Sequence, residues 1–167
     1  ILSDMGKSMV SFDRIDELLS KKPETDAPDA VDAPLNKDIS FEHVGFEYDE
    51  KNPVLKDVTF RVKAGQTVAI LGATGSGKST LMLLLQRLYD IKRGDIKIGG
   101  VSIGKIRKSC LRSRIGLVLQ EPFLYSRSVR DNVRIAMPEA PDEVVFEAAK
   151  VAAAHEFITG FEKGYDT

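Results

Sequence analysis

One glycine-rich segment, Gly72-Ala73-Thr74-Gly75-Ser76-Gly77-Lys78-Ser79, constrains the fold of this 167-residue chain more than any other feature. A short apolar, β-branched run, 67–71, precedes it, and helix-forming residues follow it to Tyr89. Glycines let the backbone curl so that its amides point inward, and a helix that begins there adds positive potential. Strand, loop and helix in this order match the phosphate-binding loop pattern. The segment therefore predicts a site for phosphate groups.

Residues at the end of this loop have distinct expected roles. Lys78 would place a full positive charge beside the terminal phosphates, and the Ser79 hydroxyl would bind Mg²⁺ that bridges the β- and γ-phosphates. Thr80 would offer another hydroxyl to a phosphate. The other expected contacts come from the loop itself, at Thr74, Gly75, Ser76 and Gly77. The alternative, a glycine-rich turn without a ligand, does not account for the strand and helix on either side.

Segments typical of strands and helices alternate along most of the chain. Strands are expected at 39–48, 54–62, 67–71, 96–98 and 115–119, and helices at 77–89, at 106–114, after Ser128 and after Pro141. This alternation predicts an α/β fold with a largely parallel sheet. The run 67–71 has the composition of a central strand that is covered on both faces.

The first 37 residues differ from the rest of the chain. Residues 1–20 place apolar side chains three or four positions apart, as in an amphipathic helix, at Met5, Met9, Phe12, Ile15 and Leu19. Residues 21–37 are rich in Pro, Asp, Ala and Lys, which is typical of an acidic, flexible linker. We therefore expect a helical extension over 1–20, a linker over 21–37 and the folded domain over 38–167.

Composition excludes several classes of function. A net charge of -1 gives no broad positive field, so no nucleic-acid partner is expected. Cys110 is the only cysteine, which rules out an internal disulfide and a zinc site made of cysteines. No run approaches the roughly 20 consecutive apolar residues of a spanning helix, so this chain itself is not expected to cross a membrane.

Segments around the loop resemble the ATP-binding half of an ABC-transporter nucleotide-binding domain, of the kind fused to a membrane exporter. The resemblance rests on the order and spacing of Val44-Gly45-Phe46-Glu47-Tyr48, Pro53-Val54-Leu55-Lys56-Asp57-Val58, Gly65 and the glycine-rich loop. It implies a P-loop NTPase core with a mainly parallel sheet and an antiparallel β subdomain. It also implies ATP and Mg²⁺ as ligands, with Val54 in the nucleotide site and Tyr48 stacked on adenine. Without the resemblance, the sequence favours Tyr48 as a core residue.

The run Gln120-Glu121-Pro122-Phe123-Leu124-Tyr125 resembles the Q-loop of this family. The resemblance implies that Gln120 binds Mg²⁺ and the attacking water, and thus acts with Lys78 in catalysis. An alternative interpretation makes Glu121 the catalytic base at the tip of a Walker B strand. That pattern requires a metal-binding Asp before the Glu, and position 120 is a glutamine.

The resemblance also implies partners and a location. In exporters of this family, the segment that corresponds to Phe123 to Val133 contacts the membrane domain, and a second nucleotide-binding domain completes the ATP site. Arg127 stands where that family commonly has glycine. Residues 1–20 resemble the extension of the last membrane helix, which implies a place on the cytoplasmic face of a membrane.

Several motifs that this family uses for hydrolysis do not occur in the 167 residues. There is no L-S-G-G-Q-like signature, no apolar strand ending in Asp-Glu after Gln120, and no histidine beyond such a strand. We therefore expect an ATP-driven exporter as the parent protein, and no efficient hydrolysis by this chain alone. A non-hydrolytic nucleotide-binding or interaction fragment is the alternative. A small-molecule kinase is a further one, although no lid or acceptor site is recognisable.

Overall fold

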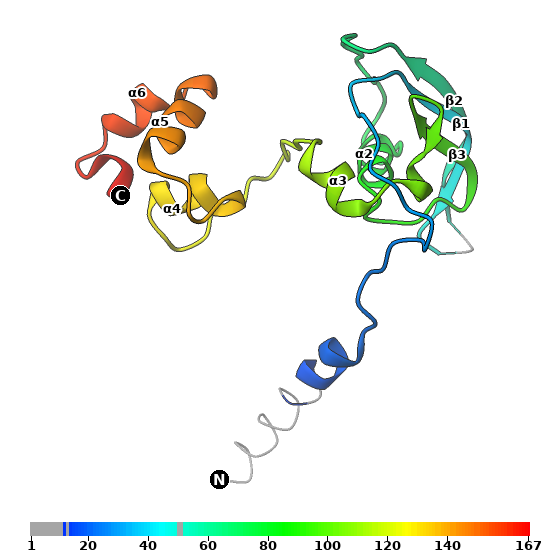
Figure 1. The fold of residues 1–167 in the computed structure, drawn as a ribbon, viewed down its shortest axis with the longest axis horizontal. Coiled ribbons are helices and arrows are strands. Elements are labelled where there is room, and N and C mark those ends of the chain that lie inside the picture. The colour runs from blue at the N-terminus through cyan, green and yellow to red at the C-terminus, as the bar shows by residue number, and fades with distance from the viewer. Residues whose placement is uncertain (1–11, 13, 50–51) are drawn as a thin grey trace. The chain divides into compact units, whose positions relative to one another are not determined.

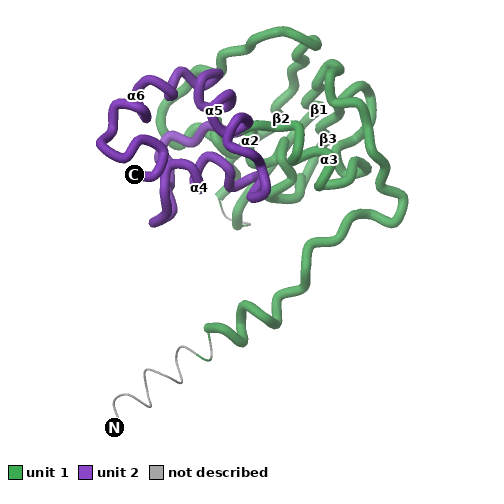
Figure 2. Tube along the Cα trace, turned by 60° about the vertical axis from the view of Figure 1, so that its left-hand side comes forward, with its two compact units in different colours: residues 1–116 green, residues 117–167 purple. Residues whose placement is uncertain are grey.

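The chain forms two compact units, Ile1–Gly116 and Leu117–Thr167, in a computed structural model that describes residues 12, 14–49 and 52–167 (Figure 2). Each unit has its own apolar core. The first unit contains the sheet and the glycine-rich loop, and the second is helical. No helix among the described residues is long and apolar enough to cross a membrane.

The first unit is built on an antiparallel sheet (Figure 1). Strand β1 (Ile39–Glu47) pairs with β2 (Pro53–Val62) on one side and with β3 (Arg93–Ile98) on the other. A short strand, β4 (Val101–Ser102), extends the sheet to the order β2-β1-β3-β4. The strands predicted at 39–48, 54–62 and 96–98 are thereby confirmed, and they form the expected antiparallel β part.

One face of this sheet packs against helix α2 (Lys78–Leu85), which directly follows the loop. Inward-facing residues of the strands meet the leucines of the helix in one core, which contains Phe41, Val44, Phe46, Leu55, Leu81, Leu84, Ile96 and Ile98. The 3-10 helix η1 (Ile103–Lys105) and helix α3 (Lys108–Ser113) close this core with Ile103, Ile106 and Leu111. Burial of the α2 leucines therefore fixes the helix, and the loop before it, to the sheet.

Helix α2 is shorter than the sequence predicts. Arg87 adopts a left-handed backbone with φ of 53°, and its amide donates to the Leu84 carbonyl at 2.9 Å. The next amide, of Leu88, donates to the Leu83 carbonyl at 3.0 Å. These bonds cap the last turn, so the predicted segment 86–89 lies outside the helix.

Two predicted strands, 67–71 and 115–119, are wrong. Neither segment is a strand, and their most exposed apolar side chains, Leu71 and Val118, are 92% and 98% exposed. A strand requires a hydrogen-bonded neighbour, and no segment in the described part of the chain pairs with either run. The parallel part of the predicted sheet is therefore not formed by the described residues, where the one parallel pairing is an isolated bridge between Val31 and Ile106.

The N-terminal residues fall into two segments. Residues 14–20 are helical, and the apolar side chains Phe12, Ile15 and Leu19 of the predicted stripe are exposed, whereas Met5 and Met9 lie outside the described residues. Residues 24–33, within the predicted linker, lie against η1 and α3. The Val31 amide donates to the Lys105 carbonyl at 2.8 Å, and the Arg107 amide donates to the Val31 carbonyl at 3.0 Å.

The second unit is a small helical cluster. It comprises α4 (Val129–Val133), η2 (Arg134–Ala136), α5 (Asp142–Val151), α6 (His155–Thr159) and η3 (Gly164–Asp166). Its core contains Val145, Ala149, Ile158 and Tyr165. The helices predicted after Ser128 and Pro141 are confirmed, and Ser128 caps α4 by accepting a bond from the Asp131 amide at 3.1 Å.

Candidate functional site

The glycine-rich loop lies between the extended segment 67–71 and the first turn of α2. Gly77 is the residue before the helix and has a φ of 89°. A Cβ at this position would lie 2.6 Å from the Cδ2 atom of Leu55 and 3.3 Å from the carbonyl oxygen of Val54. Leu55 is buried in the core, so only glycine allows the loop to pass this close to β2.

Lys78 folds back over the loop that precedes it. Its ammonium nitrogen donates to the carbonyl oxygens of Gly72 at 2.8 Å and Ala73 at 2.7 Å, and to the Ser76 hydroxyl at 3.4 Å. The positive charge is thus held at the mouth of the loop, where residues 72–76 are exposed. The first turn of α2 carries no acidic side chain that would oppose an anion.

Ser79 and Thr80 differ in their surroundings although they are neighbours. The Ser79 side chain is exposed at the start of α2. Thr80 is only 5% exposed, and its hydroxyl oxygen lies 3.1 Å from the hydroxyl of Tyr48. Ser79 is therefore open to a ligand, whereas Thr80 joins the loop to an aromatic residue that comes 32 positions earlier.

Tyr48 lies in a group of aromatic rings beside the loop. Its ring contacts Phe46 edge-to-face at 4.9 Å between ring centroids, and Tyr89 at 5.1 Å. Tyr48 is 51% exposed, so the interpretation as a core residue is wrong, because a core side chain would be covered. Tyr89 is not predicted from the sequence, since nothing in the spacing of these tyrosines indicates that they touch.

The residues predicted for phosphate and base binding come together in the first unit. Tyr48, Val54, the loop and Lys78 to Thr80 lie around the N-terminal end of α2. Among the described residues, no group of three or more His, Cys, Asp or Glu side chains could hold a metal ion. Mg²⁺ in nucleotide sites takes few protein ligands, because phosphate oxygens and waters fill most of its coordination positions. The exposed Ser79 hydroxyl fits the role of one such protein ligand.

Gln120 and Glu121 belong to the second unit and are exposed. Their roles at the site stay predictions. The segment that follows them is ordered by Asn132 of α4, whose side-chain amide donates to the carbonyls of Tyr125 at 3.0 Å and Ser128 at 2.9 Å. Arg127 has no positive φ, so the backbone at this position does not require glycine.

Exposed apolar side chains mark the segment predicted to contact a membrane domain. Phe123, Leu124 and Tyr125 are all exposed, and the rings of Phe123 and Tyr125 contact each other edge-to-face at 5.0 Å. Consecutive exposed apolar residues of this kind are typical of a surface that binds another protein.

Comparison with known proteins gives consistent matches. A family model described as ABC transporter matches residues 55–164. The chain is 42% identical over its whole length to the uncharacterized ABC transporter ATP-binding protein YknV of Bacillus subtilis, of which it covers 28%. It is 46% identical over 77% of its length to the beta-(1→2)glucan export ATP-binding/permease protein NdvA of Bartonella bacilliformis, of which it covers 22%.

A solved structure shares the fold. The structure of a bacterial Atm1-family ABC exporter with ATP bound matches 96% of this chain with a TM-score of 0.83 and 34% sequence identity. The chain covers 29% of that protein. The chain therefore matches less than a third of the length of each of these relatives.

Proposed function

Because this chain belongs to the ABC transporter family, we propose that it is the ATP-binding segment of an exporter that couples ATP binding and hydrolysis to transport of a substrate across a membrane. One observation carries the proposal. The Lys78 ammonium, the Ser79 hydroxyl and the Tyr48 ring surround the N-terminal end of a single helix. A charge, a metal-binding hydroxyl and an aromatic face are what the phosphates, the Mg²⁺ ion and the base of a nucleotide require.

The phosphate groups would be bound by the loop and Lys78. The lysine holds its ammonium group over the loop carbonyls, where it can turn toward a phosphate without leaving the loop. The backbone of Thr74 to Gly77 and the hydroxyl of Thr80 provide the remaining contacts. When bound, Mg²⁺ would neutralise charge on the β- and γ-phosphates, and Ser79, whose side chain is exposed at the start of α2, would hold it.

The base would stack on Tyr48, whose ring is half exposed beside the loop. Stacking on an aromatic face adds affinity for any base, so this contact by itself would discriminate poorly between ATP and GTP. Gln120 is proposed to orient the attacking water and to bind the metal. The segment Phe123 to Val133 is proposed to bind the membrane domain at the cytoplasmic face, and a second nucleotide-binding domain would complete the site.

The test is Mg·ATP binding and steady-state phosphate release by the 167-residue chain, with Lys78→Ala measured in parallel. Loss of a charge-assisted bond should lower the affinity by about ten- to a hundred-fold. Lys163→Ala, which removes an exposed lysine of the second unit, is the matched control and should bind ATP normally.

Two outcomes would change the proposal. Unaltered ATP affinity in Lys78→Ala would refute the phosphate site. Robust phosphate release by the wild-type chain would show that a catalytic base lies within these residues, and Glu121 would then be the first candidate. Binding without turnover is the result expected.

A further inference from the structure

Three aromatic rings beside the loop form what we call the aromatic cluster: Phe46, Tyr48 and Tyr89. Phe46 lies at the end of β1 and is buried, whereas Tyr48 and Tyr89 are 51% and 44% exposed. Tyr89 lies beyond the end of α2, in the connection to β3. All three pairs of rings are in edge-to-face contact, at centroid distances of 4.9, 5.7 and 5.1 Å.

The Tyr48 ring is held at both ends. Its hydroxyl is hydrogen-bonded to the Thr80 hydroxyl at 3.1 Å. Its ring meets Phe46 at an interplanar angle of 90° and Tyr89 at 85°. A ring fixed by two nearly perpendicular neighbours and a hydrogen bond has little freedom to rotate about its side-chain bonds. The exposed face is therefore presented in one orientation.

We propose that Tyr89 is a positioning residue for nucleotide binding, which orients the Tyr48 ring so that its free face is ready to stack on the base. The inference rests on the proposed function, in which Tyr48 contacts the base. A side chain already fixed in its binding orientation loses less conformational freedom when a ligand binds. Tyr89 thus contributes to the affinity for the base, and not to the affinity for the phosphates.

The experiment compares ATP with inorganic tripolyphosphate, which has the phosphates without the base, both in the presence of Mg²⁺. Tyr89→Leu should weaken ATP binding about three- to ten-fold, as expected for loss of an aromatic contact, and should leave tripolyphosphate binding unchanged. Tyr89→Phe keeps the ring and should bind both ligands as the wild type does. Unchanged tripolyphosphate affinity also shows that the loop of the variant is folded.

Tyr48→Leu separates this inference from the function on which it rests. If Tyr48→Leu binds ATP normally, Tyr48 does not stack on the base and the proposed function loses that contact. If Tyr48→Leu weakens ATP binding and Tyr89→Leu does not, only the positioning role is refuted. Equal weakening of ATP and tripolyphosphate by Tyr89→Leu would show a general structural role and would also overturn the inference.

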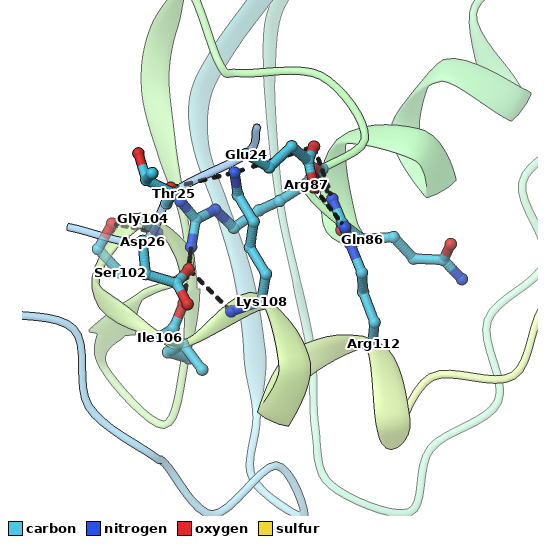
Figure 3. Close-up of polar contacts among 10 residues, drawn as sticks. All are labelled: Glu24, Thr25, Asp26, Gln86, Arg87, Ser102, Gly104, Ile106, Lys108 and Arg112. Atoms are coloured by element: carbon cyan, nitrogen blue, oxygen red, sulfur yellow. Dashed lines mark hydrogen bonds and ion pairs between the residues drawn. The ribbon is translucent and has the colours of Figure 1, made fainter. Parts of the chain in front are cut away.

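An independent observation concerns residues 24–33, which we call the acidic strap. Figure 3 shows Glu24 and Asp26 of the strap facing basic residues of the folded body. The Glu24 carboxylate accepts two bonds from the Arg112 guanidinium, at 2.6 and 3.1 Å. Asp26 accepts a bond from the Lys108 amide at 3.0 Å and lies 3.6 Å from the Arg87 guanidinium.

The same arginines also hold the carboxyl-terminal end of α2. Arg112 donates to the carbonyls of Gln86 at 3.1 Å and Arg87 at 2.7 Å, which follow the last turn of the helix (Figure 3). Arg87 in turn donates to the Ile106 carbonyl at 2.7 Å. Cations are favourable at this end of a helix, where carbonyl groups lack partners. Arg112 therefore connects the strap to the helix that carries the loop at its other end.

We infer that the acidic strap is a releasable clasp, by which we mean a segment that can detach from the folded body. It binds the residues that precede β1 to the carboxyl-terminal end of α2, which is the end opposite the loop. The bonds of Glu24 to Arg112 are partly exposed, so this ion pair is weak enough to open, whereas the backbone bonds of Val31 to Lys105 and Arg107 also hold the strap. The chain contains a reporter of its state. Cys110, the only cysteine, donates through its sulfur to the Ala33 carbonyl of the strap at 3.7 Å.

The test is the rate at which a thiol reagent such as DTNB modifies Cys110 in the folded protein. Glu24→Gln, which removes the charge, should speed modification about two- to five-fold, the range expected for a partly exposed ion pair. Asp29→Asn is the control, because the Asp29 carboxylate lies 3.9 Å from Lys105 and both side chains are well exposed, so its rate should not change. One molar salt should speed the wild type more than Glu24→Gln. Equal rates in the wild type and Glu24→Gln would overturn the clasp.

Discussion

At the scale of a single residue, substitution of Gly77 tests whether the loop must pass close to Leu55 of β2. Its φ of 89° is unfavourable for other residues, and an added Cβ would lie 2.6 Å from the buried Leu55 side chain. We expect Gly77→Ala to lower the free energy of unfolding by about 2–4 kcal/mol, through backbone strain and displacement of core atoms. ATP affinity should fall with it. Urea unfolding and nucleotide titration measure the two effects.

Gly75→Ala is the matched control for this prediction. Gly75 also has a positive φ, of 80°, but an added Cβ there would meet no atom within 4 Å. Its cost should therefore be limited to backbone strain, about 1–2 kcal/mol. Equal losses in the two variants would show that the contact between the loop and Leu55 does not constrain Gly77.

Single residues of the site were predictable where their roles depend on neighbours in the sequence. The positions of Gly77, Lys78 and Ser79 follow from the spacing of the loop and the helix after it. Tyr89 and Arg112 could not be found in this way. Their contacts with Tyr48 and Glu24 join residues 41 and 88 positions apart, which only the packing of the sheet and helices brings together.

At the scale of secondary-structure elements, an acidic side chain links the two central strands of the sheet, β1 and β3. Glu42 of β1 accepts a 2.5 Å bond from the Lys97 ammonium of β3, and this bond holds the pKa of the Glu42 carboxyl below its ordinary value of 4.5. A carboxyl with a lowered pKa in the folded state stabilises the fold above its ordinary pKa. That contribution is lost as the pH falls through the folded value.

Glu42→Gln should therefore be less stable than the wild type at pH 7. The difference in the free energy of unfolding should shrink as the pH falls below about 4.5, because the unfolded chain then binds a proton at Glu42 while the folded protein still resists protonation, and it should disappear once the pH is below the lowered pKa of the folded state. Urea unfolding at pH 7 and at pH 3.5 checks this. A difference that stays constant over this range would contradict a role for the Glu42 charge.

The elements of the antiparallel sheet were predictable because their strands alternate apolar and polar residues. The runs 67–71 and 115–119 also have strand-like composition, yet composition does not supply a hydrogen-bonded neighbour. The end of α2 was missed for a different reason. Arg87 ends the helix in a conformation normally taken by glycine, and its bond to the Ile106 carbonyl at 2.7 Å helps to hold it there.

At the scale of the whole molecule, the chain passes from the first unit to the second through a stretch without regular secondary structure, residues 117–127, at the start of the second unit. It contains exposed apolar residues that chymotrypsin accepts, among them Leu119, Phe123, Leu124 and Tyr125. We expect limited chymotrypsin digestion to cut here first, because an extended, exposed backbone fits a protease more easily than a sheet or helix does. Mass spectrometry of the earliest fragments identifies the site.

The buried aromatic residues of β1 provide the internal comparison for that digestion. Phe41 and Phe46 are enclosed in the core of the first unit and should be cut only after unfolding. Early cleavage at these residues would mean that the sheet opens more readily than the connection between the units. The order of cleavage thus tests the division of the chain into two units.

The bonds from Lys78 to the loop carbonyls change what its substitution would measure. A phosphate that approaches the ammonium group replaces at least one bond that is already made, so binding is an exchange of partners and not the addition of a new one. Lys78→Ala would remove the bond that the lysine forms with the phosphate. It would also remove the bonds to the Gly72 and Ala73 carbonyls that stabilise the loop when no ligand is bound. The affinity lost on substitution is therefore a difference between two states of the loop, and it is not the strength of the contact between lysine and phosphate.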